Sequence, residues 1–312
     1  MARALLAPQL LILYVLAASA LYVHFRGRVR HRFRRQLLDH STFMAPYNAL
    51  MYLTSAVPAT PFVDTKHCPE LDPLRERWPV IRDEALRLYE GAHIRAAARH
   101  NDVAFDAFFR RGWKRFYLKW YDDVLPSARE LCPETVALVQ SIPSINAALF
   151  ALLPPHSRLG EHRDPFAGSL RYHLGLVTPN SDDCRIYVDG APYSWRDGEA
   201  VLFDETYVHS AVNDTDVTRI ILFCDVTRPI RYPVMRAVNR FVTRHIVKAT
   251  AAQNTDTEKV GVVNQLYGVI HRVRDLSREL KRSNRRLYYA LKYAVLALAL
   301  YLVFFSAVIH RG

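Results

Sequence analysis

Two long apolar segments, one near each end of the chain, constrain the fold of this sequence more than any other feature. Residues 4–25 (ALLAPQLLILYVLAASALYVHF) contain no Asp, Glu, Lys or Arg, and residues 288–309 (YYALKYAVLALALYLVFFSAVI) contain only Lys292. About 20 apolar residues are enough for a helix to cross a bilayer. We therefore predict transmembrane anchors within residues 1–35 and 288–312. The alternatives are a secretory signal peptide for the first segment and a buried core helix for the second.

Basic residues flank each apolar segment on the side that faces the middle of the chain. Six arginines lie between residues 26 and 35, and five lysines or arginines lie between residues 278 and 286. Lys and Arg beside a membrane span stay on the cytoplasmic side. The sequence therefore predicts that both termini face away from the cytoplasm and that the intervening chain lies inside it. An anionic membrane surface then explains much of the net charge of +12, without nucleic acid.

The middle of the chain has the pattern of an all-β domain. Short runs rich in β-branched and aromatic residues alternate with turn-forming clusters. Strands are predicted at residues 113–120, 146–153, 169–177, 184–188, 200–203, 207–212 and 218–225. Many short strands at this spacing favour a sandwich or barrel over a βαβ fold. The four cysteines include no C-x-x-C pair, which argues against a zinc module.

The segments around this β region are expected to be mostly helical. Helices are predicted at residues 74–99 and 133–141. Residues 41–73 are rich in proline and are expected to form a loop or a connector lying partly on the membrane. We assign residues 36–232 to one cytoplasmic domain and residues 233–287 to a basic helical connector.

One group of polar residues in the β region suggests a metal site. His162 and Asp164 are two residues apart, so they face the same way on an extended segment. His209 supplies a second, distant imidazole. Two imidazoles and one carboxylate suit iron(II) in oxygenases, because they leave coordination positions open. The alternatives are a surface hydrogen-bonding pair for His162 and Asp164, and a structural role for His209.

Arg219 is the candidate cation for an acidic cosubstrate. It lies ten residues after His209, beyond the turn cluster of residues 213–216. If these residues form a hairpin with an odd number of turn residues, His209 and Arg219 share one face. The planar guanidinium of arginine matches a carboxylate. We therefore predict that Arg219 binds the distal carboxylate of 2-oxoglutarate.

Three fragments resemble a known family in order and spacing. They are HRDPFAGSLRYHLGL (162–176), YSWRDGEAVLFDETYVH (193–209) and RIILFCDVTRP (219–229). They resemble the aspartyl/asparaginyl β-hydroxylases, and most of all the bacterial lipid A 2-hydroxylases, which are similar from about residue 43 to residue 229. The resemblance implies a mainly β, double-stranded β-helix (jelly-roll) fold between the two anchors, with iron(II), 2-oxoglutarate and dioxygen.

The resemblance also implies roles for single residues. The metal histidines of the family fall on His162 and His209. Asp164 completes the metal triad where the protein-modifying branch of the family has glycine. Residues that bind 2-oxoglutarate fall on Arg171, His173, Arg219 and, with looser spacing, Trp120. A hydroxyl residue used by that branch falls near Ala151, so this contact is expected to be missing.

The expected protein is a membrane-bound, iron(II)- and 2-oxoglutarate-dependent dioxygenase. By resemblance, it sits in the bacterial inner membrane and hydroxylates carbon 2 of a secondary acyl chain of lipid A or a precursor. Two anchors with basic flanks suit a phosphorylated membrane glycolipid better than a soluble peptide. The alternatives are a peptidyl Asp/Asn β-hydroxylase and a non-catalytic jelly-roll module that binds an anionic lipid.

Overall fold

The protein is described here by a computed structural model. It describes residues 8–37, 39–95, 102, 106–109, 111–121, 123–255, 257–258 and 260–309.

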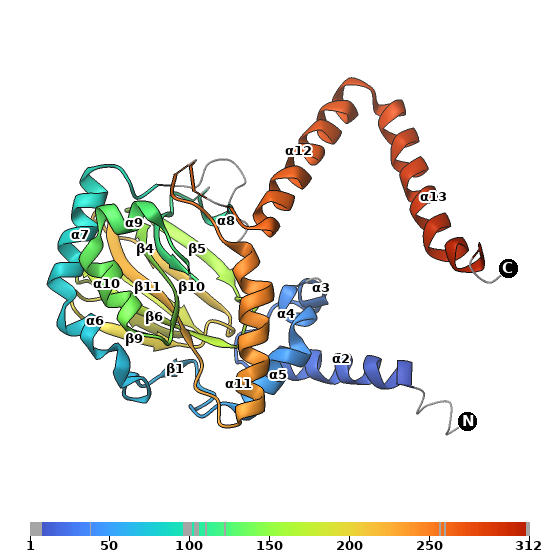
Figure 1. Ribbon diagram of the computed structural model, residues 1–312. Helices are drawn as coiled ribbons and strands as arrows, with labels where there is room; N and C mark the ends of the chain where they lie inside the picture. The colour runs from blue at the N-terminus through green and yellow to red at the C-terminus, as the bar shows by residue number, and fades with distance from the viewer. Residues whose placement is uncertain are drawn as a thin grey trace.

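Two antiparallel sheets form the centre of the fold (Figure 1). The larger sheet has the strand order β1-β9-β6-β11-β4-β2-β3, and the smaller has the order β5-β10-β7-β8. The strands are β1 (Phe62–Val63), β2 (Lys114–Trp120), β3 (Asp123–Val124), β4 (Ile145–Leu153), β5 (Ser157–His162), β6 (Ser169–Val177), β7 (Cys184–Val188), β8 (Ala191–Ser194), β9 (Ala200–Phe203), β10 (His209–Asn213) and β11 (Arg219–Thr227). This confirms the mainly β architecture predicted from the strand spacing.

Helices flank the two sheets. They are α2 (Pro8–Phe25), α3 (Phe33–Leu37), α4 (His40–Phe43), α5 (Ala45–Thr54), α6 (Asp72–Glu76), α7 (Trp78–Glu90), α8 (Asp106–Phe109), α9 (Pro126–Leu131), α10 (Pro133–Ser141), α11 (Pro233–Val242), α12 (Val262–Ser283) and α13 (Arg285–Ile309). Short 3₁₀ turns cover Thr65–His67, Pro69–Leu71 and Lys248–Thr250, and a π turn covers Thr243–Val247. Helices α7, α9 and α10 pack on the outer face of the larger sheet, whereas α12 and α13 project away from the sheets (Figure 1).

The central strands of the larger sheet are buried on both faces, which explains their nearly continuous apolar sequence. Every residue of β11 except the last is buried, and β4 and β6 have almost the same pattern. Helix α7 contributes Ile81, Ala85 and Leu88 to the core on the outer side. These three residues lie on one face of a helix because they are four and three residues apart. The core therefore lies on both sides of the larger sheet.

Several sequence predictions need correction. The segment at residues 41–73, predicted as a loop, contains most of α4 and all of α5. Proline does not prevent α5, because Pro46 stands in its first turn, where proline is tolerated. Strand β5 was missed because its sequence, SRLGEH, lacks alternating apolar residues. The predicted helix at residues 74–99 ends at Glu90, and its residues 96–99 lie outside the described residues.

Both terminal apolar segments form helices, α2 and α13, but they differ from the predicted anchors. In the part of the chain that the structure describes, no helix is both long and apolar enough to cross a membrane. The prediction of two membrane spans is therefore not supported. The inner end of α2 packs on the β domain, where Ser19 and Val23 are buried beside α5. Helix α13 begins with two arginines and includes Lys292.

One arginine of the first basic block has a structural role. Arg26 was expected at the lipid headgroups, but its guanidinium is buried and pairs with Asp204. Asp204 also pairs with the buried Arg228 at 2.8 Å. Burial alone would raise the pKa of Asp204, but the two guanidinium groups hold that pKa well below its usual range. This charged cluster fastens the end of α2 to the β domain.

Candidate active site

A cavity between the two sheets collects the predicted site residues. It has a volume of about 500 Å³, including its open mouth. It is lined by Phe108, Trp113, Ala151, Leu159, His162, Asp164, Arg171, His173, Ile186, Trp195, Phe203, His209, Ser210, Ala211, Arg219, Ile221 and Phe223. Both sheets contribute to this lining, so the cavity lies inside the β domain. Of the predicted site residues, only Trp120 is not in the lining.

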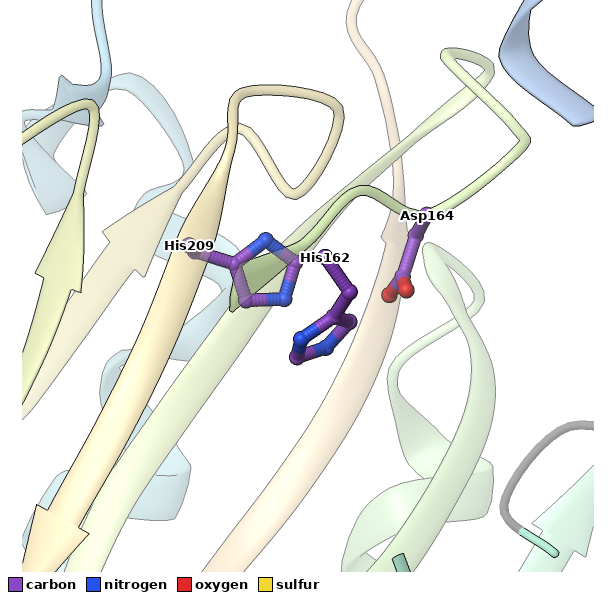
Figure 2. A group of neighbouring side chains, drawn as sticks. All are labelled: His162, Asp164 and His209. Atoms are coloured by element: carbon purple, nitrogen blue, oxygen red, sulfur yellow. The ribbon is translucent and has the colours of Figure 1, made fainter. Parts of the chain in front are cut away.

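His162, Asp164 and His209 come together at one end of this cavity. His162 ends β5 and His209 begins β10, and the two residues are direct partners across these antiparallel strands. Their ring centroids are 4.1 Å apart. Asp164 follows β5, and one ligand atom from each of the three residues lies within 4.8 Å of the others. Figure 2 shows the two imidazoles side by side, with the carboxylate of Asp164 turned toward them. This donor set fits a metal ion.

The tautomer and the neutral state of both histidine rings favour metal binding. The Nδ1–H of His162 donates to the carbonyl of Gly160 at 2.8 Å, and that of His209 donates to the carbonyl of Tyr207 at 3.0 Å. In each ring, Nε2 therefore carries the lone pair that can bind a metal ion. Burial lowers the pKa of both histidines, and lowers that of His209 to about 3, with the charge of His162 adding to the effect. Both rings are neutral at pH 7, as metal binding requires.

Asp164 lies beside a buried guanidinium. Burial alone would raise the pKa of Asp164, but the guanidinium of Arg171 holds that pKa below its ordinary value. Arg171 Nη2 donates to Asp164 at 2.8 Å, and Arg171 Nε donates to Asp225 at 2.8 Å. Arg171 also contacts Glu205. Asp164 is therefore an ionised carboxylate, and Arg171 is surrounded by three acidic groups.

Burial opposes the ionisation of Glu205 in this cluster. Burial raises the pKa of Glu205 well above its ordinary range despite Arg171, and the nearby carboxylates add to the shift. The hydroxyl of Ser169 donates to Glu205 Oε1 at 2.7 Å. Since Arg171 already contacts three acidic groups through Nε and Nη2, it is poorly placed to bind an additional carboxylate from a cosubstrate. This differs from the role that the family resemblance implied for Arg171.

Arg219, unlike Arg171, has no acidic partner among the described residues. It is 2% exposed, and among the described residues it forms no ion pair. Its guanidinium stacks over the Trp195 ring at 4.3 Å, and its Nε has no hydrogen-bond partner. Burial lowers the pKa of Arg219 to about 10, so the group is still charged at pH 7. Burying a cation without an acidic partner lowers the stability of the fold unless a bound anion compensates the charge.

The predicted hairpin between His209 and Arg219 is wrong. Strand β10 pairs with β5 and β7 in the smaller sheet, whereas β11 pairs with β4 and β6 in the larger one. The chain crosses from one sheet to the other at residues 214–218. Both side chains still line the one cavity, but they reach it from opposite sheets.

The remaining predicted cosubstrate residues divide into two groups. His173 lines the cavity beside Phe203 and Phe223, and neither of its ring nitrogens has a hydrogen-bond partner in the described part of the chain. Trp120 packs on Tyr117 and Tyr121 away from the cavity lining. The tryptophans that line the cavity are Trp113 and Trp195. The geometry therefore gives no support to a cosubstrate contact from Trp120.

Sequence reasoning missed Asp225 and Trp195 in this site. Asp225 had a usable signal, because Arg219 and Asp225 are six residues apart on β11, and an even spacing places them on one face of a strand. Trp195 had none, since it follows β8 at the end of a chain segment without a metal or charge motif. Ala151 lines the cavity and carries no hydroxyl, as the resemblance implied.

The N-terminal helices hold the segment that carries His162 and Asp164. Arg163 Nη1 donates to the carbonyl of Val23 at the end of α2. Asn48 on α5 donates to the carbonyl of Pro165 at 2.9 Å and accepts from the amide of Ala167 at 3.0 Å. The ligand-bearing segment is therefore attached directly to α2 and α5.

The part of the chain that carries these residues matches a known protein family. A family model described as aspartyl/asparaginyl beta-hydroxylase matches residues 75–229. The matched range contains all the metal and cosubstrate candidates named above.

Two curated relatives match parts of the chain. The ornithine lipid ester-linked acyl 2-hydroxylase of Rhizobium tropici is 41% identical over 128 residues, which are 41% of this chain and 45% of the relative. Human aspartate beta-hydroxylase domain-containing protein 2 is 31% identical over 126 residues, which are 38% of this chain and 34% of the relative. The matches thus span less than half the length of these relatives.

Among solved structures, a prolyl-4-hydroxylase from Pseudomonas putida is similar with a TM-score of 0.34 and 18% identity. The match covers 48% of this chain and 86% of that one. A similarity at this level carries no argument, and the assignment depends on the sequence match. Through residues 75–229, the chain belongs to the aspartyl/asparaginyl β-hydroxylase family.

Proposed function

We propose that this protein is an iron(II)- and 2-oxoglutarate-dependent hydroxylase that acts on carbon 2 of an ester-linked acyl chain in a membrane lipid. The observation that carries the proposal is Arg219, a buried cation without an acidic partner among the described residues. It shares one cavity with His162, Asp164 and His209. A metal triad and an unpaired cation together suit a metal with an acidic cosubstrate.

The residues present fit both groups. Neutral His162 and His209 would offer Nε2, and Asp164 would offer an ionised oxygen. Arg219 would bind the distal carboxylate of 2-oxoglutarate. When bound, iron(II) and 2-oxoglutarate supply the chemistry that uses dioxygen to convert a C–H bond to C–OH, while 2-oxoglutarate is converted to succinate and carbon dioxide.

The contribution of the chain is to orient these groups and to exclude water. The carbonyls of Gly160 and Tyr207 fix the orientation of the two imidazole rings. Trp195 stacks on Arg219 and so restricts the direction of its guanidinium. Apolar side chains dominate the remaining walls, where they keep water from the reacting groups and suit an acyl chain.

Two observations support a membrane lipid as substrate. The relative from Rhizobium tropici is named for 2-hydroxylation of an ester-linked acyl chain. In this chain, the segment that carries the ligands is attached to α2 and α5, and α2 exposes a row of large apolar side chains. An ornithine lipid and lipid A both fit the proposal, because each carries an ester-linked acyl chain.

Succinate formation with different substrates tests the proposal. The purified full-length protein receives iron(II), 2-oxoglutarate and one candidate: ornithine lipid, a lipid A precursor or an aspartate-containing peptide. We expect succinate and a lipid with one added oxygen, detected by mass spectrometry, with at least one lipid and not with the peptide. Hydroxylation of the peptide alone would refute the lipid assignment.

We further propose that Arg171 positions Asp164 and does not bind 2-oxoglutarate. Arg171→Lys keeps the charge but loses the fork that reaches Asp164 and Asp225 together. Loss of a group that orients a metal ligand typically costs about 10- to 100-fold in metal affinity. We expect a loss of that size in iron affinity, with little change in the apparent KM for 2-oxoglutarate. An increased KM at unchanged iron affinity would return Arg171 to the cosubstrate site.

A further inference from the structure

Helix α11 exposes two large apolar side chains and fully buries a polar one, while its other large apolar residues, Met235, Val238 and Val242, are half-buried. Its one buried residue is Asn239. Val234 and Phe241 are 68% and 62% exposed. They are seven residues apart, so they lie on the same face of the helix, two turns from each other.

Polar contacts hold the helix in this orientation. The amide of Asn239 donates to the carbonyl of Gly168 at 2.9 Å, and its oxygen accepts from the hydroxyl of Tyr47 on α5 at 2.7 Å. A Cβ at Gly168 would lie 2.1 Å from the Asn239 oxygen and 2.2 Å from the Tyr47 hydroxyl, so only glycine permits this approach. These contacts fix the rotation of α11 in which Val234 and Phe241 are exposed.

The neighbouring helix adds to the same exposed area. Helices α5 and α11 pack together (Figure 1). Leu50 and Leu53 of α5 are 44% and 71% exposed, and Phe43 of α4 is 73% exposed. Residues 50 and 53 are three apart and so lie on one side of α5, whereas Phe43 ends the preceding helix α4. We call the exposed side chains of Phe43, Leu50, Leu53, Val234 and Phe241 the α5–α11 face.

The charges around this face have one sign. The sequence contains no Asp or Glu from residue 226 to residue 255 or from residue 40 to residue 63. Exposed arginines lie along and beside α11: Arg231, Arg236, Arg240 and Arg244. A helix with an apolar stripe and arginines beside it, without acids, is typical of helices that lie in the interface of an anionic bilayer.

From these observations we infer that the α5–α11 face docks on the surface of an anionic phospholipid bilayer. This inference rests in part on the proposed function and adds a membrane-binding surface to it. Asn48 of α5 holds Pro165 and Ala167, which follow the metal candidates His162 and Asp164 in the chain. A bilayer held by α5 and α11 is therefore next to the segment that carries the site. A second copy of the chain is a poorer occupant, because its own arginines would face these arginines.

A fluorescent probe on the face tests the inference. All four native cysteines are buried, so a cysteine introduced by Phe241→Cys in the full-length protein can be labelled selectively with an environment-sensitive dye. The control is Tyr89→Cys on α7, which is 43% exposed and outside the α5–α11 face. All vesicles carry brominated acyl chains. The anionic vesicles contain phosphatidylglycerol and phosphatidylethanolamine, and the neutral vesicles contain phosphatidylcholine alone.

We expect the dye at position 241 to be quenched severalfold by brominated anionic vesicles and much less by neutral ones, whereas the dye at position 89 is not quenched. Adding Arg236→Glu and Arg240→Glu to the labelled Phe241→Cys protein should reduce the quenching. An unquenched dye at position 241 would overturn the inference, whether or not the protein binds vesicles. A concentration-dependent change without vesicles would overturn it in favour of a second copy.

The same variants separate this inference from the proposed function. Succinate formation with detergent-dispersed lipid does not require docking and measures the active site alone. Normal quenching without succinate formation would refute the proposed function and leave the docking surface. Succinate formation without quenching would refute the docking surface and leave the proposed function.

Discussion

Replacing His209 with alanine is expected to abolish hydroxylation together with iron(II) binding. The substitution removes one of three donors that lie within 4.8 Å of one another, and none of the other described residues that line the cavity is a second candidate in that cluster. His162→Ala should have the same effect, because the two rings are paired across β5 and β10. Iron binding is measured by equilibrium dialysis of the purified protein, and turnover is measured as succinate formed.

A matched control separates metal loss from general damage. His156→Ala removes an exposed histidine on the β4–β5 loop, where its ring pairs with Asp216 outside the cavity lining, and should keep full activity. Thermal unfolding of the His209→Ala protein should remain cooperative, since the β core does not depend on this ring. Wild-type turnover in His209→Ala would remove the basis for an iron site at these three residues. Asp164→Gly should weaken iron binding and retain some turnover.

Replacing Arg219 with alanine is expected to leave iron bound and the enzyme close to inactive at ordinary 2-oxoglutarate concentrations. Hydrogen bonds to a charged group contribute about 1.5–3 kcal/mol, which corresponds to a rise of roughly 10- to 100-fold in the apparent KM for 2-oxoglutarate. Arg219→Lys keeps the charge but loses the planar fork and the stacking on Trp195, so we expect a smaller rise in the same constant.

The comparison of two Michaelis constants decides the role of Arg219. The apparent KM for the lipid should change much less than that for 2-oxoglutarate in both variants. Arg158→Ala is the control, because it removes an exposed arginine of β5 that pairs with Asp214 outside the cavity. Poorer lipid binding at an unchanged KM for 2-oxoglutarate would instead identify Arg219 as a contact for a substrate headgroup, and the cosubstrate cation would have to be another residue.

Local patterns determined most of the β framework. Strands β6, β7 and β9 begin and end where the sequence analysis placed them, because their β-branched and aromatic runs are bounded by clear turn residues. The metal candidates were also visible locally, since two residues in an extended segment share a face when their spacing is two. The strand β5 that carries His162 was not visible, because its own residues lack this apolar pattern.

The tertiary structure decided which charges are free. Arg171 and Arg219 look alike in the sequence, each in an apolar strand, but Arg171 meets three acidic groups and Arg219 meets a tryptophan. Those neighbours come from other strands and from the loops after them. Their positions depend on sheet order, which local sequence does not encode. We therefore propose a positioning role for Arg171 in place of the predicted cosubstrate contact.

The terminal segments show the same division. Their apolar composition predicted helices, and helices are present at α2 and α13. Composition did not reveal that Arg26 is buried with Asp204 and Arg228, or that Asn239 holds α11 with Val234 and Phe241 exposed. Helix formation depends on residues within one or two turns of each other, and the sequence alone determines it. Which face is buried depends on partners that are distant in the sequence, and only the folded chain brings them together.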